Sequence, residues 1–342
     1  MINTMSNKQP ITFGSLFSGA GGFDLGLENA GWHCKFQVEW DKHCQQVLQH
    51  HWGDVPKWED VQQVNGADLP PVDVIAWGSP CQDLSNAGNR AGLDGKKSSM
   101  FFEGIRIIKE MREATNATYP TISIWENVAG AISSNNGDDF QTVLREMANA
   151  GCDHIEWRVL DSQWFRIAQR RRRIFVVAIW DSATTITGEQ QVLAVKNNSQ
   201  THIQLPAKTI STNDKKWEQR QSGDCAGSNQ SFEGSQPVEP LVIDGNRIGD
   251  IRAYANGISP TLSASMVNKT NVPILIVDGV ARDMTHIECE RLMGWADDHT
   301  RFRADGKETP SSQRYKMCGN GVVSPVATWI AQRITAALTR YQ

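Results

Sequence analysis

Short apolar runs alternate with amphipathic runs through the first half of the chain. The apolar runs have the length of strands, whereas the runs between them repeat apolar residues at helical spacing. The predicted strands cover residues 11–17, 34–39, 73–77, 121–125, 154–160 and 174–180, and the predicted helices cover residues 23–31, 42–52, 99–114 and 139–150. This alternation is typical of an α/β protein in which helices cover a mostly parallel sheet.

The pattern changes after residue 180. Residues 181–250 are rich in Gln, Asn, Ser, Thr and Gly, and the alternation of strands and helices stops there. A strand is predicted over 273–277, and a helix over 285–294 begins with a capping box. A glycine turn around 317–325 leads into a last helix. We therefore expect three segments: a first domain over 11–180, a small irregular domain over 181–255, and a segment over 256–342 whose final helix returns to the first domain.

Composition narrows the class of protein without changing this picture. Of the 342 residues, 39% are hydrophobic and 21% are charged, as in a folded protein. The formal net charge is −4, so a nucleic-acid partner would need a local basic face. The seven cysteines include no CxxC pair, which favours a reducing cytoplasm and argues against disulfides and a zinc site. The polar N-terminus predicts no signal peptide, and no apolar run is long enough to span a membrane.

A glycine turn follows the first predicted strand. Residues 18–22 (Ser-Gly-Ala-Gly-Gly) let backbone N–H groups approach a ligand, and the helix that follows favours a carboxylate or phosphate at its N-terminus. Glu39 lies near the place where dinucleotide-binding folds put a ribose-binding carboxylate, while Asp41 is expected to cap the next helix. Residues 59–61 offer a second polar contact to a nucleoside. A turn that only packs strand against helix would fit the same glycines.

Cys81 lies on a polar, glycine-containing loop that follows the strand at 73–77. Open α/β sheets bind their ligands at this edge, beyond the carboxyl ends of the strands. Cysteines are usually small core residues, but the neighbours of Cys81 do not form a core pattern, and Pro80 restricts the backbone before it. We therefore predict that the Cys81 thiolate is a nucleophile.

Glu126 comes directly after the apolar strand at 121–125. Burial at that position would raise its pKa and make it a proton donor, and an exposed helix cap is the alternative.

The run Gln-Arg-Arg-Arg-Arg at 169–173 leads into the strand at 174–180. Strand geometry would direct side chains alternately, so that one face receives Gln169, Arg171 and Arg173 and the other receives Arg170 and Arg172. A run of charges is usually a solvated face. Arginines beside a buried strand are better placed to hold a phosphate or an acidic side chain.

Seven short motifs follow one another along the chain. They are Leu-Phe-Ser-Gly-Ala-Gly-Gly-Phe at 16–23, Glu-Trp-Asp at 39–41, Gly-Ser-Pro-Cys-Gln at 78–82, Glu-Asn-Val at 126–128, Gln-x-Arg-x-Arg at 169–173, Ile-Ser-Pro-Thr-Leu at 258–262 and Gly-Asn-Gly-Val at 319–322. In this order they resemble the DNA cytosine-5 methyltransferases of the bacterial and phage restriction–modification type. The resemblance covers nearly the whole chain outside 181–250. It implies a Rossmann-like, S-adenosylmethionine-dependent catalytic domain over 11–180, a target-recognition domain over 181–255, and a hinge with a C-terminal segment over 256–342.

The resemblance also assigns the catalytic roles. Carbon 5 of cytosine is a poor nucleophile, and addition of the Cys81 thiolate to carbon 6 turns the ring into an enamine. Glu126 would be the acid at N3. Arg171 and Arg173 would favour the thiolate and hold the cytosine carbonyl oxygen or a phosphate, with no division between them. The base would have to be flipped out of the duplex.

Binding residues follow from the same resemblance. Those expected around S-adenosylmethionine are Phe17, Gly19, Gly21 and Gly22 at the methionine end, Glu39 at the ribose, Trp40, Asp60 and Val61 at the adenine, and Pro80, Asn320 and Val322 completing the pocket. Those expected to contact DNA are Gln82, Ser85 and Gln169. No metal is expected. Two residues depart from the family pattern: Ser15 stands where Asp is common, and Met100 where Leu is usual.

Three other functions remain open at this point. A tRNA cytosine methyltransferase of the same lineage usually carries Thr in the loop after Pro-Cys-Gln-Pro-Phe, where this chain has residues 83–85 (Asp-Leu-Ser). A nicotinamide-dependent oxidoreductase leaves the Pro-Cys-Gln motif unexplained, and a non-catalytic DNA-binding relative leaves Cys81 and Glu126 without a role.

We expect a cytoplasmic, nucleoid-associated monomer that acts on double-stranded DNA. The resemblance to the restriction–modification type leaves open a functional pairing with a restriction endonuclease.

Overall fold

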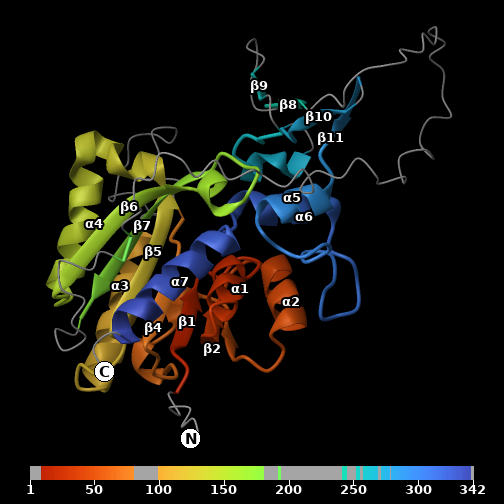
Figure 1. Ribbon diagram of the computed structural model, residues 1–342. Coiled ribbons are helices and arrows are strands. Elements are labelled where there is room, and N and C mark those ends of the chain that lie inside the picture. Colours follow the sequence, from red (N-terminus) through yellow and green to blue (C-terminus); the bar gives the residue numbers. More distant parts are fainter. Residues whose placement is uncertain are drawn as a thin grey trace, which may run out of the picture.

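The computed structural model describes residues 9–80, 99–180, 192–193, 241–244, 252–254, 257–268, 271–277 and 279–339. Its centre is a seven-stranded sheet with the strand order β3-β2-β1-β4-β5-β7-β6 (Figure 1). The strands are β1 (Thr12–Leu16), β2 (His33–Val38), β3 (Lys57–Trp58), β4 (Val74–Trp77), β5 (Ile122–Val128), β6 (His154–Asp161) and β7 (Arg172–Ile179). The α/β architecture predicted from the alternating pattern is confirmed.

The sheet is mostly parallel, as predicted, but one end of it is antiparallel. The strands from β3 to β5 pair in parallel. By contrast, β7 pairs antiparallel with both β5 and β6. The connection between β6 and β7 holds only the short 3₁₀ helix η6 (Ser162–Phe165), and so small a link favours an antiparallel turn over a crossover. The carboxyl ends of β1, β2, β4 and β5 therefore share one edge of the sheet.

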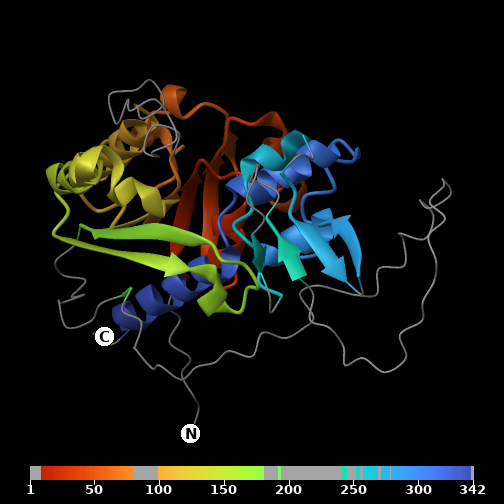
Figure 2. The same ribbon diagram turned by 90° about the horizontal axis from the view of Figure 1, so that it is seen from above.

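Helices cover both faces of the main sheet (Figure 2). One core includes residues of α1 and α7 with the apolar side chains on one face, and the other includes residues of α3 and α4 on the opposite face. Among the described residues, no helix combines the length and apolar character needed to cross a membrane. The helices are α1 (Gly22–Glu28), α2 (Lys42–His51), α3 (Ser99–Ala114), α4 (Asp138–Asn149), α5 (His286–Leu292), α6 (Ser311–Asn320) and α7 (Ser324–Thr339).

The last helix returns to the first domain, as expected. A Cβ atom built on Gly26 of α1 would lie 2.6 Å from the Cβ of Ala327 in α7, so glycine permits this close approach. Trp32 Nε1 also donates to Thr335 Oγ1 at 2.9 Å. Residues from the two ends of the described chain thus share one core.

A second, smaller sheet lies beside α5 and α6 (Figure 1). Its strands are β8 (Leu241–Ile243), β9 (Ala253–Tyr254), β10 (Ile274–Val277) and β11 (Val280–Asp283), and they pair antiparallel in the order β11-β10-β8-β9. Val242 and Leu275 are buried in the same core as α7. The boundary expected at residue 255 therefore falls between two strands of one sheet.

Local signals predicted several elements correctly and missed others. The helix at 99–114, the N-cap Asp41 and the capping box of Thr285 with Glu288 are confirmed. The helix α6 was not expected, because Gly319 and Asn320 resemble a turn. A Cβ on Gly319 would lie 2.3 Å from the backbone of Ser263, so this glycine lets the η8 segment (Ala264–Asn268) approach the helix. β3 was also missed, since two residues carry no periodic pattern.

Candidate active site

The ends of β4 and β5 place the segment that precedes Cys81 beside Glu126. Ser79 Oγ accepts a hydrogen bond from Trp125 Nε1 at 3.1 Å, and Ser79 O accepts one from Asn127 Nδ2 at 3.2 Å. A Cβ on Gly78 would lie 3.3 Å from Glu126 Oε2. The glycine thus leaves the carboxylate room at the point where the chain leaves the sheet. Cys81, Gln82 and Ser85 lie outside the described residues.

Glu126 is buried inside the end of β5 rather than just after it. Its side chain pairs with Arg173, whose Nε lies 3.2 Å from Glu126 Oε1. The sheet register explains the pair, because Phe175 is opposite Glu126 and Arg173 is its diagonal neighbour on the same face. Burial raises the pKa of Glu126, and the charges of Arg173 and Arg171 act against that shift. Of the two alternatives that the sequence left open, burial with a raised pKa is therefore the one that the structure shows.

Arg171 has a different environment from Arg173. Its Nη1 donates to Leu262 O at 3.0 Å, and its Nη2 donates to Gly319 O at 3.0 Å and Gly321 O at 2.7 Å. Arg171 is only 2% exposed. The guanidinium therefore joins the start of β7 to the hinge segment and to the end of α6. Of the two arginines, Arg173 is the one that pairs with Glu126.

Gln169 has no exposed surface. Its Nε2 donates to Leu292 O at 2.9 Å, and its Oε1 accepts from Leu262 N at 3.2 Å. In this conformation its amide cannot reach DNA, because both of its ends are bound to backbone groups inside the protein. We therefore do not retain Gln169 as a proposed DNA contact. The alternation expected for this run holds, since Arg170 and Arg172 are exposed while Gln169 and Arg171 are buried.

The exposed arginines line a cavity of about 460 Å³ between the main sheet and the small sheet. Thr261 Oγ1 donates to Arg170 O at 2.6 Å, so the Ile-Ser-Pro-Thr-Leu segment packs along the arginine run. The cavity is lined by Arg170, Arg172, Asp244, Tyr254, Pro260, Thr261 and Ser263. Arg170 and Arg172 were not among the predicted catalytic residues or DNA contacts. Arg170 and Arg172 alternate with Arg171 and Arg173 along the run, so they lie on the other face. This alternation is the sequence signal that could have identified them as a separate site.

A second cavity, of about 260 Å³, lies at the carboxyl ends of β1 and β2. Six of the residues expected around S-adenosylmethionine line it: Phe17, Glu39, Trp40, Asp60, Val61 and Pro80. Val38, Glu59, Gln62 and Met100 complete the lining. Glu39 accepts hydrogen bonds from Gly19 N and Asp41 N, each at 2.7 Å. Burial raises the pKa of Glu39, while these two donors lower it.

The glycine turn adopts backbone angles that favour glycine. Gly19 has a φ of 57° and Gly21 a φ of 84°, and Phe17 also has a positive φ of 55°. A Cβ on Gly19 would meet no atom within 4 Å, so this residue borders open space, whereas a Cβ on Gly22 would lie 2.4 Å from Val322 O. Gly22 and Val322 are thus brought together. Asn320 is exposed at the end of α6, and neither it nor Val322 lines the cavity.

These features fit S-adenosylmethionine. The cavity offers apolar and aromatic side chains for the adenine and carboxylates for the ribose hydroxyl groups. The turn beside it has open space at Gly19. Both carboxylate oxygens of Asp60 accept hydrogen bonds, Oδ1 from Gln62 N at 3.0 Å and Oδ2 from Gln63 Nε2 at 3.3 Å.

Ser15 departs from the family pattern, and a buried carboxyl group lies beside it. Ser15 Oγ lies 3.1 Å from Asp24 Oδ2, and Gln37 Nε2 donates to Asp24 Oδ1 at 2.8 Å. Burial raises the pKa of Asp24 to about 6. The carboxyl group beneath the turn therefore comes from α1 instead of β1.

Known proteins share this fold. Over 96% of the chain, the fold matches the solved S. pombe Dnmt2 methyltransferase (TM-score 0.63, 15% identity, 99% of that chain). It also matches a putative DNA modification methyltransferase encoded within an E. coli prophage (TM-score 0.62, 21% identity, 96% of this chain and 99% of that chain). The chain thus has the fold of these two solved methyltransferases.

The sequence comparison defines the family. The family model described as C-5 cytosine-specific DNA methylase matches residues 11–336. The type II methyltransferase M.HhaI of Haemophilus parahaemolyticus is 30% identical over 336 residues, which cover 96% of this chain and 95% of that protein. The chain belongs to the C-5 cytosine-specific DNA methylases, and it is a cytosine-5 DNA methyltransferase.

Proposed function

We propose that this enzyme transfers a methyl group from S-adenosylmethionine to carbon 5 of cytosine within a short double-stranded DNA sequence, through a covalent bond between Cys81 and carbon 6 of the base. The observation that carries the proposal is the placement of Gly78 and Ser79, shortly before Cys81: Gly78 adjoins the buried carboxyl group of Glu126, and Ser79 bonds the residues on either side of Glu126 in β5. A nucleophile and an acid on neighbouring strand ends can act on the same ring.

The chemistry divides between these two residues. The Cys81 thiolate forms a bond to carbon 6 while Glu126 gives its proton to N3, and carbon 5 becomes nucleophilic. S-adenosylmethionine supplies an electrophilic methyl group when it is bound. Loss of the carbon 5 proton to a base, expulsion of the Cys81 sulfur and return of the N3 proton to Glu126 restore the aromatic ring and both side chains.

The surroundings of Glu126 suit a proton donor. A donor must hold a proton near neutral pH, and burial raises its pKa in that direction. Arg173 holds the carboxyl group from the diagonal position of the neighbouring strand. The same charge lies at the strand ends from which Cys81 follows, where a cation favours the thiolate.

We assign the two cavities to the two ligands. The cavity around Glu39 would hold S-adenosylmethionine, with the carboxylate at the ribose hydroxyl groups and Trp40 at the adenine. The cavity around Arg170 and Arg172 would receive the DNA backbone, because guanidinium groups bind phosphates well. Base flipping costs a few kcal/mol, and phosphate contacts of this kind can offset it. Ser85 and Gln82, on the loop after Cys81, are further proposed DNA contacts.

The decisive test is to trap the covalent bond. The protein is incubated with S-adenosylmethionine and duplex DNA carrying 5-fluorocytosine in every cytosine context. A base cannot remove fluorine from carbon 5 as it removes the proton of cytosine, so the covalent bond persists. We expect a stable protein–DNA adduct, with the modified peptide containing Cys81. Labelled methyl transfer to unmodified duplex DNA and to tRNA, measured side by side, distinguishes the two substrates. Preferential transfer to tRNA, or the absence of an adduct, would refute the proposal. Bisulfite sequencing of DNA from cells that express the chain then identifies the target sequence.

A further inference from the structure

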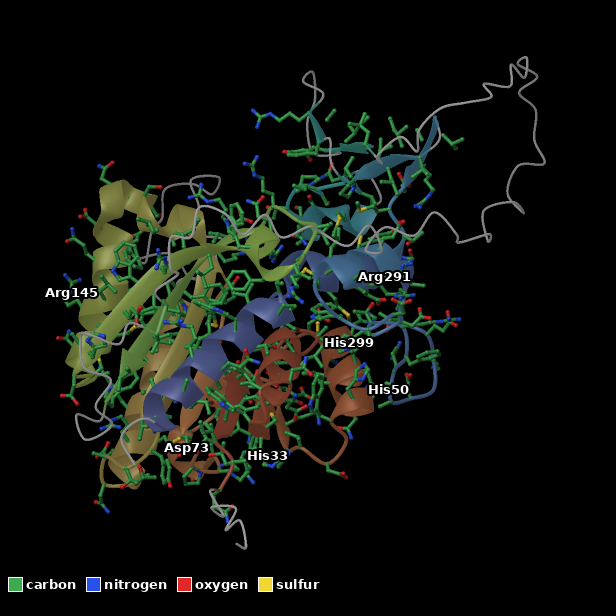
Figure 3. The ribbon with its side chains drawn as sticks, in the orientation of Figure 1. His33, His50, Asp73, Arg145, Arg291 and His299 are labelled. Atoms are coloured by element: carbon green, nitrogen blue, oxygen red, sulfur yellow. The ribbon has the colours of Figure 1, made fainter. Side chains whose placement is uncertain are left out.

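Two side chains from the C-terminal part of the chain bind carbonyl groups of the glycine turn. His299 Nε2 lies 2.8 Å from Ala20 O, and Ser324 Oγ donates to Gly22 O at 2.7 Å. His299 lies where the C-terminal segment meets α1 and α2 (Figure 3). These contacts join residues separated by 279 and 302 positions in the sequence. The turn is thus held from outside the strand and helix that it connects.

The tautomer of His299 follows from its partner. A carbonyl oxygen only accepts hydrogen bonds, so Nε2 of His299 must carry the proton that bonds Ala20 O. His299 is 5% exposed, and burial lowers its pKa to about 4, so the ring is neutral at neutral pH. Its only ring N–H group is therefore used at the turn.

Packing fixes the position of both donors. The ring of His51 in α2 stacks on His299 with centroids 4.2 Å apart, and His51 Nε2 lies 2.8 Å from His299 O. Trp295 Nε1 donates to Ser324 Oγ at 3.1 Å. Neither donor can leave the turn without breaking another buried contact. On the opposite side of the turn, Gly19 N is held by Glu39.

We propose that His299 and Ser324 are positioning residues for S-adenosylmethionine: they hold the glycine turn in the shape that binds the methionine end of the cofactor. This inference rests on the proposed function of the turn and its cavity. Glycines are free to adopt many backbone angles in an unrestrained chain, and the two carbonyl contacts hold the turn in this one conformation. Neither residue belongs to the motifs from which the binding residues were predicted.

The test is the affinity for S-adenosylmethionine, measured by isothermal titration calorimetry without DNA. His299→Phe keeps a ring for stacking but removes the donor, and we expect about tenfold weaker binding, as for the loss of one buried hydrogen bond. His299→Gln can place its Nε2 near the same point, and we expect most of the affinity to return. Ser324→Ala should weaken binding by a similar factor. For His299→Phe and Ser324→Ala, kcat at saturating cofactor should stay near that of the wild type while KM for the cofactor rises, and for His299→Gln both should stay near the wild-type values.

Tyr315→Phe is the matched control. Tyr315 OH donates to Met284 O at 2.6 Å in the same part of the chain but does not touch the turn. Its affinity for the cofactor should equal that of the wild type, even if its melting temperature falls. Equal affinity in the wild type, His299→Phe and Ser324→Ala would overturn the inference, as would equal weakening in Tyr315→Phe. Failure of the wild type to bind S-adenosylmethionine would instead refute the proposed function, and the positioning role with it.

Discussion

Arg171 and Arg173 point to the same side of the chain, yet they serve two different regions. Arg173 pairs with a buried carboxyl group at the end of β5, whereas Arg171 binds three backbone carbonyls of the hinge and α6. Gln169 belongs to the second region, because its amide binds Leu292 and Leu262. A single short motif thus contributes to the proposed catalytic site at one end and to the attachment of the hinge at the other.

The length of β5 explains this division. β5 ends at Val128, which is opposite Arg173 in β7. Before Arg173 there is no β5 residue for β7 to pair with, and segments from later in the chain take that place, as the bridge between Gln169 and Ser259 shows. The alternating side chains of this run therefore contact a strand at Arg173 and the hinge segment at Arg171 and Gln169.

The largest effect should come from the residue that bonds to the base. Cys81→Ala removes the nucleophile, so we expect no measurable methyl transfer to duplex DNA. The affinity for S-adenosylmethionine should remain near that of the wild type, as measured by calorimetry. Methylation at the wild-type rate would exclude Cys81 from the mechanism.

Glu126→Gln tests the catalytic side of the comparison. The amide keeps the shape of the side chain but cannot give a proton to N3, so we expect single-turnover methyl transfer to fall by about 10²- to 10⁴-fold. Base binding should persist. Because burial raises the pKa of Glu126, the ionised carboxyl lowers the stability of the folded protein at neutral pH, and the variant should unfold at the same urea concentration as the wild type or a higher one. A wild-type rate would contradict the assignment.

Arg171→Met tests the attachment side. It leaves three backbone carbonyls without their donor, and we expect the free energy of unfolding to fall by about 3 kcal/mol. Urea denaturation followed by circular dichroism measures this change. Arg172→Met, at the exposed neighbouring position, is the control and should change stability by less than about 0.5 kcal/mol. Similar losses in the two variants would show that Arg171 does not fasten the hinge.

Arg173→Met should change the pH dependence of catalysis. The charge of Arg173 lowers the pKa of Glu126, so its removal raises that pKa further. Activity needs protonated Glu126 and therefore falls as the pH rises through this pKa. We expect the alkaline limb of the kcat profile to move to higher pH in Arg173→Met and to be absent in Glu126→Gln. An unmoved limb would separate Arg173 from the acid.

The smallest effect belongs to the exposed side of the same run. Replacing Arg170 or Arg172 with Gln should weaken DNA binding at every sequence and lower the slope of log affinity against log salt by about 1 for each arginine. Fluorescence anisotropy with a labelled duplex at several salt concentrations measures the slope. An unchanged slope would place the phosphates elsewhere.

The amino-acid sequence alone determined the local elements and the order of the motifs. The helix α3 and the caps at Asp41 and Thr285 followed from periodicity and from short-range hydrogen bonding, both of which act between neighbouring residues. The cavity around Glu39 was also foreseen, because parallel strands bring their carboxyl ends to one edge.

Only the tertiary structure decided what covers each buried side chain. Periodicity shows that Gln169 and Arg171 face inward. It does not show that they form hydrogen bonds with backbone groups of Leu262 and Gly319 instead of with a ligand. The helix α6 overrides the turn signal of Gly319 because another segment packs against that glycine. His299 meets Ala20 only after the chain has folded. Such contacts join residues far apart in sequence, and packing, not local preference, selects them.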